Sequence, residues 1–219
     1  GSTGFGVAHA ASTAAKMIGL DLHGATVAIH GFGNVGTFTY RYLRDMGATI
    51  VAIADRSGAV YASAGLNHKE ITEVIDGKKL LYACTGRSRI ETEAFWQLPV
   101  DILIPASVTD VINEKNKDGI RAKIIVEAGN IPMREEIEDE LFQKGVFVVP
   151  DFVANAGGVI SSYAEYRGYN PKRMFDLVER KIKASTKRVM EKSLKQKKNP
   201  RKIALAIAKE RVTMKGKSL

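Results

Sequence analysis

The feature that most constrains this chain is a glycine-rich turn between an apolar strand pattern and a helix pattern. Residues 26–43 read TVAIHGFGNVGTFTYRYL, so that three glycines stand in the spacing G-x-G-x-x-G. A second β-branched run, residues 48–55, follows the predicted helix. Strand, glycine turn, helix and strand in this order predict one βαβ unit.

Each glycine of this turn has its own predicted role. Gly31 permits the tight turn, Gly33 lets backbone N–H groups approach a pyrophosphate, and Gly36 lets the helix pack close to the strand. The N-terminus of the helix offers free N–H groups and the positive end of its dipole to phosphates. Asp55, at the end of the second strand, is placed to accept hydrogen bonds from ribose hydroxyls. The pattern therefore predicts a dinucleotide site.

Two questions about the ribose end stay open. Asp55 precedes a Ser-Gly pair, so the residue could serve only to form a turn. A carboxylate at Asp55 disfavours a 2′-phosphate, whereas the neighbouring guanidinium of Arg56 could pair with one. The residues favour NAD as the cofactor, with NADP or the use of both still open.

Three later apolar runs predict strands that are covered on both faces, because they are continuous rather than alternating. Helix patterns at residues 109–120 and 134–145 separate these runs, which cover residues 100–107, 123–130 and 145–152. Alternating strands and helices predict an α/β fold, a Rossmann-like, doubly wound, mainly parallel sheet. We expect one NAD(P)-binding domain over residues 1–219, with a core over about 20–155 and a helical C-terminal segment over about 156–219.

The helical C-terminal segment carries the basic charge of the chain. Residues 167–219 hold 18 of the 33 Lys and Arg residues and 4 of the 24 acidic ones. Apolar residues at helical spacing predict a buried stripe on this segment, namely Met174, Phe175, Val178, Ile182, Val189 and Leu194. Lysines and arginines away from the stripe could neutralise phosphates of a nucleic acid, but no recognition motif accompanies them. A solvated lysine-rich surface is the favoured interpretation.

Other classes of protein are disfavoured by what the composition lacks. No apolar run approaches the length of a membrane helix, and the first residues do not resemble a secretory leader. Cys84 is the single cysteine, which excludes an internal disulfide and favours a reducing compartment. We therefore expect a soluble, cytoplasmic protein. The histidines His9, His23, His30 and His68 show no metal-ligand spacing, so no metal is expected.

Four further stretches, together with the glycine turn, carry a resemblance to a known family. They read TGFGV (3–7), PVDILIPAS (99–107), KIIVEAGN (123–130) and DFVANAGGVISSYAEY (151–166). In this order they resemble the glutamate/leucine/phenylalanine/valine dehydrogenases, and the glutamate dehydrogenases in particular. One departure is that Glu-Ala-Gly-Asn replaces the family's usual Glu-Gly-Ala-Asn.

The resemblance implies a role for each matching residue. It places the nicotinamide ribose beside Ala106 and Ser107 with Asn130 nearby, and the carboxamide beside Thr3. Asn155 would orient the nicotinamide or the amino acid, and Ser162 would reach the side-chain carboxylate of glutamate. The pyrophosphate would be held by the whole turn, Gly31, Phe32, Gly33, Asn34, Val35 and Gly36, and the adenosine ribose by Asp55.

The resemblance also implies what these residues do not supply. Family members carry a catalytic lysine and aspartate in an N-terminal domain, and no lysine here lies in the matching Gly-Gly-x-Lys-Gly context. We therefore expect a cofactor domain without catalytic residues of its own, which needs that N-terminal domain, an amino-acid substrate and a homo-oligomeric assembly to act. The alternative is a stand-alone nucleotide-sensing module.

Overall fold

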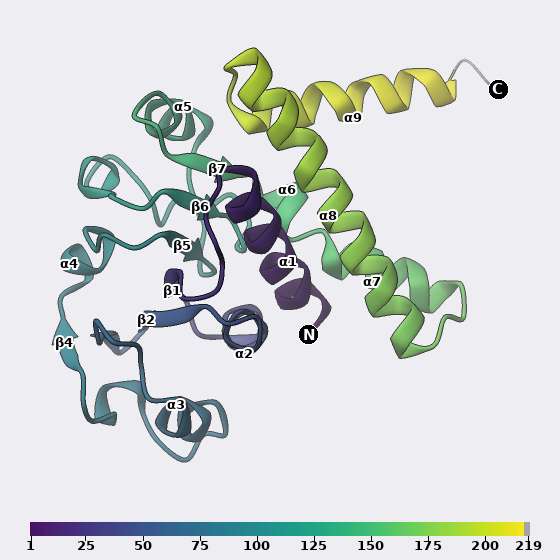
Figure 1. Ribbon diagram of the computed structural model, residues 1–219. Coiled ribbons are helices and arrows are strands. Elements are labelled where there is room, and N and C mark those ends of the chain that lie inside the picture. Colours follow the sequence, from purple (N-terminus) through teal and green to yellow (C-terminus); the bar gives the residue numbers. More distant parts are fainter. Residues whose placement is uncertain (217–219) are drawn as a thin grey trace.

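The computed structural model describes residues 1–216 and shows a sheet with helices on both faces (Figure 1). Within these residues the sheet has seven strands, β1 (Thr26–His30), β2 (Thr49–Asp55), β3 (Gly58–Tyr61), β4 (Ser88–Ile90), β5 (Ile102–Pro105), β6 (Ile124–Val126) and β7 (Phe147–Val149). The α-helices are α1 (Ser2–Met17), α2 (Asn34–Asp45), α3 (His68–Ile75), α4 (Thr92–Trp96), α5 (Glu135–Gln143), α6 (Asp151–Ala154), α7 (Gly157–Tyr166), α8 (Pro171–Gln196) and α9 (Pro200–Gly216).

The order of the strands confirms the predicted fold class. The sheet runs β4-β3-β2-β1-β5-β6-β7, and every neighbouring pair from β2 to β7 is parallel. The edge strands β3 and β4 are antiparallel additions beyond β2. From β1 the chain continues to β2 on one side and later to β5 on the other. The carboxyl ends of β1 and β5 therefore form the switch point at which sheets of this kind bind ligands.

Residues of the central strands enter two separate cores, one on each face of the sheet. Val27 and Ile29 pack with α1, α2 and α8 on one face, whereas Ala28 packs with α4 and α5 on the other. Both faces are covered, which explains why the strand patterns are continuously apolar. Burying one side chain the size of Val or Ile contributes about 1.5–3 kcal/mol, so each central strand is anchored from both sides.

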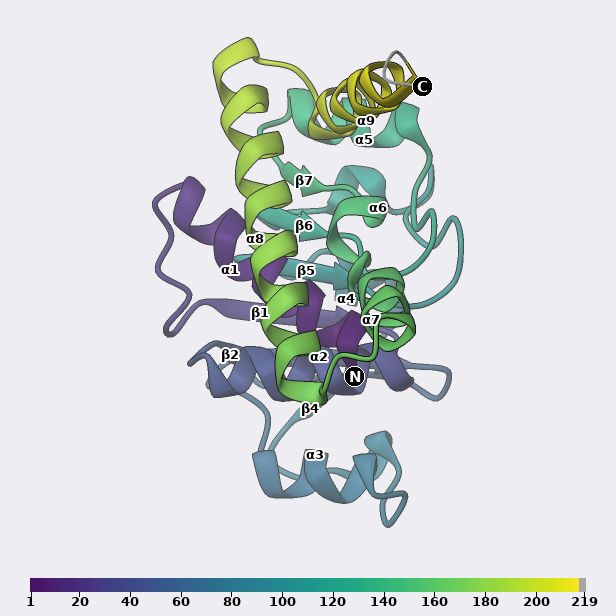
Figure 2. The same cartoon turned by 90° about the vertical axis from the view of Figure 1, so that its right-hand side faces the viewer.

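Glycines allow α1 to lie against two neighbouring helices. A Cβ at Gly4 would stand 2.8 Å from the backbone nitrogen of Thr39 in α2. A Cβ at Gly6 would stand 3.4 Å from the Cα of Gly157 in α7. The first turn of α1 is therefore wedged between α2 and α7, and Figure 2 shows α8 crossing over α1 from outside.

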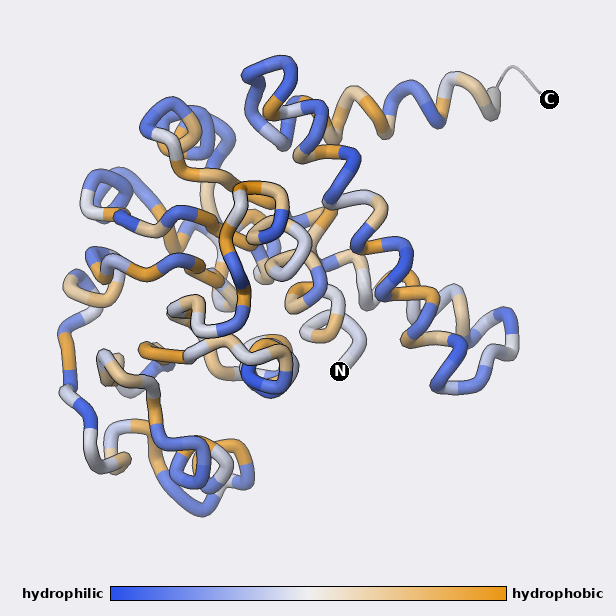
Figure 3. Tube along the Cα trace, in the orientation of Figure 1, coloured by the Kyte–Doolittle hydropathy of each residue, from blue (hydrophilic) through white to orange (hydrophobic). Residues whose placement is uncertain are grey.

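The long helix α8 confirms most of the predicted apolar stripe. Asn170 caps its first turn by accepting a hydrogen bond from the Arg173 amide, and Pro171 opens the helix. Hydrophilic and hydrophobic residues alternate along it (Figure 3). Leu194 was expected in the stripe but is 46 % exposed, because the buried face runs through Val189, Met190 and Ser193.

The helix predicted over residues 109–120 is wrong. Apart from the short 3₁₀ turn Lys117–Gly119, this connection is irregular. The side-chain amide of Asn113 donates to the Asp110 carbonyl oxygen (3.0 Å), and the side-chain amide of Asn116 donates to the Val111 carbonyl oxygen (2.8 Å). Asparagine side chains that bond the backbone locally compete with the helical pattern. Ile112 is still fully buried, so the loop covers the second core as a helix would.

None of the helices within residues 1–216 is long and apolar enough to cross a membrane.

Candidate cofactor site

The glycine turn is held between the ends of three strands. The Gly31 amide donates to the Ala54 carbonyl oxygen of β2 (2.8 Å), and the Ala106 amide donates to the His30 carbonyl oxygen (2.7 Å). Gly31 has φ +100°, and a Cβ there would stand 2.7 Å from the Ala106 carbonyl oxygen. Both the positive φ and the close approach require glycine.

The fold requires a glycine at residue 36 but not at residue 33. A Cβ at Gly36 would stand 2.0 Å from the Gly31 carbonyl oxygen, so helix and turn could not both keep their positions. At Gly33 a Cβ would meet no atom within 4 Å, and φ is −81°, which any residue adopts. No contact in the described chain explains a glycine at residue 33. The open space in front of it fits a group that approaches from outside.

The first turn of α2 presents free hydrogen-bond donors to this space. Within residues 1–216, the amides of Phe32, Gly33, Asn34 and Val35 have no acceptor. The first turn of α2 contains no acidic side chain, and no side chain caps it. Unpaired amides and the positive end of a helix dipole form an anion site. These four amides and the open space at Gly33 form a cradle that fits the pyrophosphate of a dinucleotide.

Asp55 lies at the end of β2, beside this turn. One carboxylate oxygen, Oδ1, accepts hydrogen bonds from the amide (2.7 Å) and the hydroxyl (2.5 Å) of Ser57. The turn-forming role is thus real, yet no residue of the described chain bonds the other oxygen, Oδ2. Arg56 is exposed within the same turn. Asp55 can therefore form the turn through Oδ1 and still accept from a ribose hydroxyl through Oδ2.

The other predicted residues gather at the ends of β5, β6 and β7. A Cβ at Gly129 would stand 2.9 Å from the Ser107 carbonyl oxygen, which brings β5 and β6 together. Asn155 donates from Nδ2 to Asn130 Oδ1 (3.2 Å) and to the Gly129 carbonyl oxygen (3.3 Å). These bonds occupy the amide nitrogen of Asn155 and leave its oxygen available as an acceptor.

Thr3 and Ser162 both lie next to Gly158. The hydroxyl of Ser162 donates to the Gly158 carbonyl oxygen (3.1 Å), and a Cβ at Gly158 would stand 2.9 Å from Thr3 Oγ1. No hydrogen bond in the described residues joins this pair to Asn155. The structure therefore collects the predicted residues into two groups, one around the sheet ends and one at the α1–α7 contact.

His30 was overlooked as a site residue in the sequence. Its Nδ1 lies 2.8 Å from Ser107 Oγ, and its ring stacks on Trp96 with the centroids 4.5 Å apart. Burial lowers the pKa of His30 to about 4. Its place at the end of a strand, next to Gly31, was the available signal, because strand ends converge at a switch point.

A buried ionic cluster was also missed. Arg201 of α9 reaches Glu127 (2.9 Å), Glu138 (2.8 Å) and Asp151 (2.9 Å), of which Glu127 and Glu138 are fully buried. Burial and the neighbouring Glu138 carboxylate raise the pKa of Glu127. The Asp151 carboxylate accepts a hydrogen bond from the Ile131 amide (2.9 Å), next to Asn130. Since these partners lie 50 or more residues from Arg201 in all four of its hydrogen bonds, no local pattern could reveal them.

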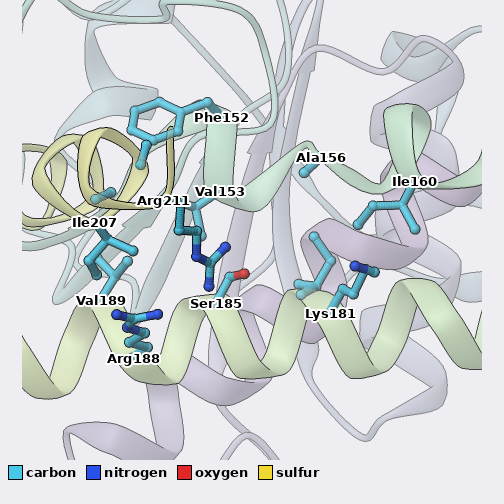
Figure 4. Close-up of a pocket in the computed structure, with 13 residues that line it drawn as sticks. Phe152, Val153, Ala156, Ile160, Lys181, Ser185, Arg188, Val189, Ile207 and Arg211 are labelled. Atoms are coloured by element: carbon cyan, nitrogen blue, oxygen red, sulfur yellow. The ribbon is translucent and has the colours of Figure 1, made fainter. Parts of the chain in front are cut away.

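A separate cavity of about 160 Å³ lies between α6, α7, α8 and α9 (Figure 4). Its lining is mainly apolar and also includes Lys181, Arg188 and Arg211. None of the predicted site residues lines it. Across the described residues, no group of three or more His, Cys, Asp or Glu side chains could hold a metal ion.

The parallel sheet, its switch point and the glycine turn define a Rossmann-type domain of the dehydrogenase class. The family model for glutamate/leucine/phenylalanine/valine dehydrogenases matches residues 1–218. The chain belongs to this family, as the resemblance implied.

Individual relatives agree with this assignment. The chain is 39 % identical to the glutamate dehydrogenase of Aeropyrum pernix, over 96 % of this chain and 53 % of that protein. It is 42 % identical to the NADP(+)-dependent glutamate dehydrogenase of Pyrobaculum calidifontis, over 75 % of this chain and 40 % of that protein. The chain thus spans about half the length, or less, of these relatives.

A solved structure shows the same fold. The hetero-hexameric glutamate dehydrogenase of Thermus thermophilus, in its leucine-bound form, superimposes with a TM-score of 0.84 at 26 % identity. The match covers 96 % of this chain and 51 % of that one. Neither alternative, a stand-alone nucleotide-sensing module or a nucleic-acid-binding protein, is supported by these matches.

Proposed function

We propose that this chain is the NAD(P)-binding domain of a glutamate dehydrogenase, an oxidoreductase of amino-acid metabolism. The observation that carries the proposal is the cradle at Gly33, where open space meets the unpaired amides of α2. In the complete enzyme, L-glutamate, NAD(P)⁺ and water would give 2-oxoglutarate, ammonia, NAD(P)H and a proton. The nicotinamide supplies the hydride acceptor when it is bound.

The residues of this chain would bind and orient rather than transfer protons. The amides from Phe32 to Val35 would hold the pyrophosphate, and the free oxygen of Asp55 would accept from the adenosine ribose. The free amide oxygen of Asn155 would accept from the carboxamide or from the amino group of the substrate. Ala106 and Ser107 would lie beside the second ribose.

The choice between NAD and NADP rests on the residues after β2. The carboxylate of Asp55 would repel a 2′-phosphate, so we propose a preference for NAD. The exposed guanidinium of Arg56 could offset part of this repulsion. The NADP(+)-dependent relative from Pyrobaculum calidifontis is 42 % identical, so family membership alone does not decide the preference.

We further propose that residues outside this chain complete the active site. The chain covers 53 % of the glutamate dehydrogenase of Aeropyrum pernix, so about half of such an enzyme would come from residues outside it. Ser162 would contribute to recognition of the glutamate side chain, and Thr3 to that of the carboxamide. Because the superimposed structure from Thermus thermophilus is a hexamer, we also propose an oligomeric enzyme, here a homo-oligomer. We place it in the cytoplasm, where the buried Cys84, which forms no disulfide, stays reduced.

A fluorescence titration with NADH and with NADPH tests the cofactor assignment. We expect saturable binding, tighter for NADH, and a Gly33→Ala variant that folds but binds neither nucleotide well. A protein that binds neither nucleotide in its unchanged form would contradict the proposal.

A kinetic comparison tests the substrate. With the complete protein, glutamate should reduce NAD⁺, and Ser162→Ala should raise the KM for glutamate while the KM for NAD⁺ stays the same. Reduction that is equally fast with leucine or phenylalanine would overturn the assignment to glutamate and leave the family intact.

A further inference from the structure

The bond between His30 and Ser107 joins the two strands of the switch point. His30 is the last residue of β1 and Ser107 follows the end of β5 by two positions, yet Nδ1 and Oγ lie 2.8 Å apart. In the parallel register His30 pairs with Pro105, and its ring lies on the face of the sheet that α4 covers, against Phe95 and Trp96. The contact lies beside Gly31, where a Cβ would stand 2.8 Å from the Cβ of Ser107.

The imidazole is held in one orientation by its neighbours. Its ring stacks on Trp96 with an interplanar angle of 30°, and the edge of Phe95 meets it with the centroids 5.5 Å apart. Phe95 and Trp96 are themselves buried in the second core, at 1 % and 3 % exposed. Since α4 fixes both rings, His30 cannot turn away from Ser107 without disturbing that core.

The imidazole is also neutral near pH 7. Burial lowers the pKa of His30 to about 4, well below pH 7. A neutral imidazole has one donating and one accepting nitrogen. Whichever role Nδ1 takes toward Ser107, it uses one role of the hydroxyl and leaves the complementary role available.

We propose that His30 is a positioning residue that orients the Ser107 hydroxyl toward the nicotinamide-side ribose of the dinucleotide. The inference rests on the proposed function, which places that ribose beside Ser107. A residue outside the glycine motif would thus set the direction of the ribose contact, through a hydrogen bond between the ends of β1 and β5. The hydroxyl would otherwise rotate freely and bind the ribose at an added entropic cost.

Three nucleotides separate this role from simple packing. NADH and ADP-ribose both contain the second ribose, whereas ADP lacks it but shares the adenosine and the pyrophosphate. A hydroxyl misdirected at the second ribose should weaken NADH and ADP-ribose and leave ADP unchanged. A damaged turn should weaken all three nucleotides equally.

The variants are His30→Leu, which removes the hydrogen bond, and His30→Asn, whose amide can replace Nδ1. Calorimetric titration of the purified protein should show NADH and ADP-ribose bound roughly fivefold to tenfold more weakly by His30→Leu. His30→Asn should restore most of this loss. Ser107→Ala should show the same loss, and the double variant His30→Leu/Ser107→Ala should lose no more than either alone.

Each other outcome has a definite meaning. If the unchanged protein binds neither ADP nor NADH, the proposed function fails. If it binds both, and His30→Leu weakens ADP as much as NADH, or weakens neither, the positioning role is wrong and His30 only packs. Additive losses in the double variant would also overturn it, because the two side chains would then act independently.

Discussion

Gly36 and Gly31 touch so closely that a Cβ at residue 36 would stand 2.0 Å from the carbonyl oxygen of Gly31. The contact fixes the angle at which α2 leaves the turn, and so it aims the free amides of the helix. Gly33 lies between the two glycines and has no such neighbour. Within one motif, Gly36 is therefore required for packing, whereas Gly33 leaves room for a ligand. Substitutions at the two positions can separate these roles.

We expect Gly36→Ala to destabilise the fold. A Cβ that overlaps a backbone carbonyl forces the turn or the helix to move, which typically costs about 1–3 kcal/mol or more. Urea unfolding should show a lower midpoint at an unchanged slope. A variant as stable as the unchanged protein would contradict the close contact.

We expect Gly33→Ala to have the opposite profile. Its φ of −81° suits alanine and the added methyl group meets no atom, so stability should change by less than about 1 kcal/mol. NADH affinity should fall at least tenfold, because the methyl group would occupy the approach of the pyrophosphate. Urea unfolding of both variants provides the control, since Gly36→Ala should lower the unfolding midpoint and Gly33→Ala should not.

We expect Asp55→Ser to shift the nucleotide preference toward NADPH. Removing the carboxylate removes the repulsion of a 2′-phosphate and leaves Arg56 to attract it. The ratio of the two dissociation constants measures the shift. Ser57→Ala is the control, because it removes the hydroxyl bonded to Asp55 Oδ1 but keeps the carboxylate. An unchanged ratio in Asp55→Ser would show that Asp55 only forms the turn.

We expect Arg201→Met to destabilise the protein by about 3–5 kcal/mol, since it leaves buried carboxylates without their cation. Arg201→Lys should lose less, because it keeps the charge but cannot reach three carboxylates with one planar group. Urea unfolding near pH 7 measures both. If Arg201→Met were as stable as the unchanged protein, the buried carboxylates would not depend on Arg201 for their stabilisation.

We expect His30 to make stability depend on pH. Its folded pKa of about 4 lies below the unfolded value of 6.5, so the unfolded chain takes up a proton first as the pH falls. Stability should therefore drop between pH 6.5 and 4, by up to about 3 kcal/mol from this residue. Burial also lowers the pKa of His9 and His68, so the measurement is the difference between the unchanged protein and His30→Asn. A difference that stays constant with pH would mean that His30 is charged or solvated.

Local order along the chain determined the class of the protein. The strand at residues 26–30, the glycine spacing after it and the apolar run that ends at Asp55 act within one βαβ unit, where neighbours in sequence are neighbours in space. The continuously apolar strand patterns likewise predicted a sheet covered on both faces. The connection over residues 109–120 was misjudged, because asparagine side chains override a helical pattern by bonding the nearby backbone.

Only the tertiary structure decided which residues meet across the sheet. His30 and Ser107 are 77 positions apart, and Arg201 and Glu127 are 74 apart, so neither pair leaves a periodic trace in the sequence. Parallel strands bring their carboxyl ends to one edge only after the crossovers have formed, and a hydrogen bond at that edge depends on register and side-chain direction. The sequence determined that a nucleotide site should exist after Gly31, and the packing of β1 against β5 decided which hydroxyl lies beside it.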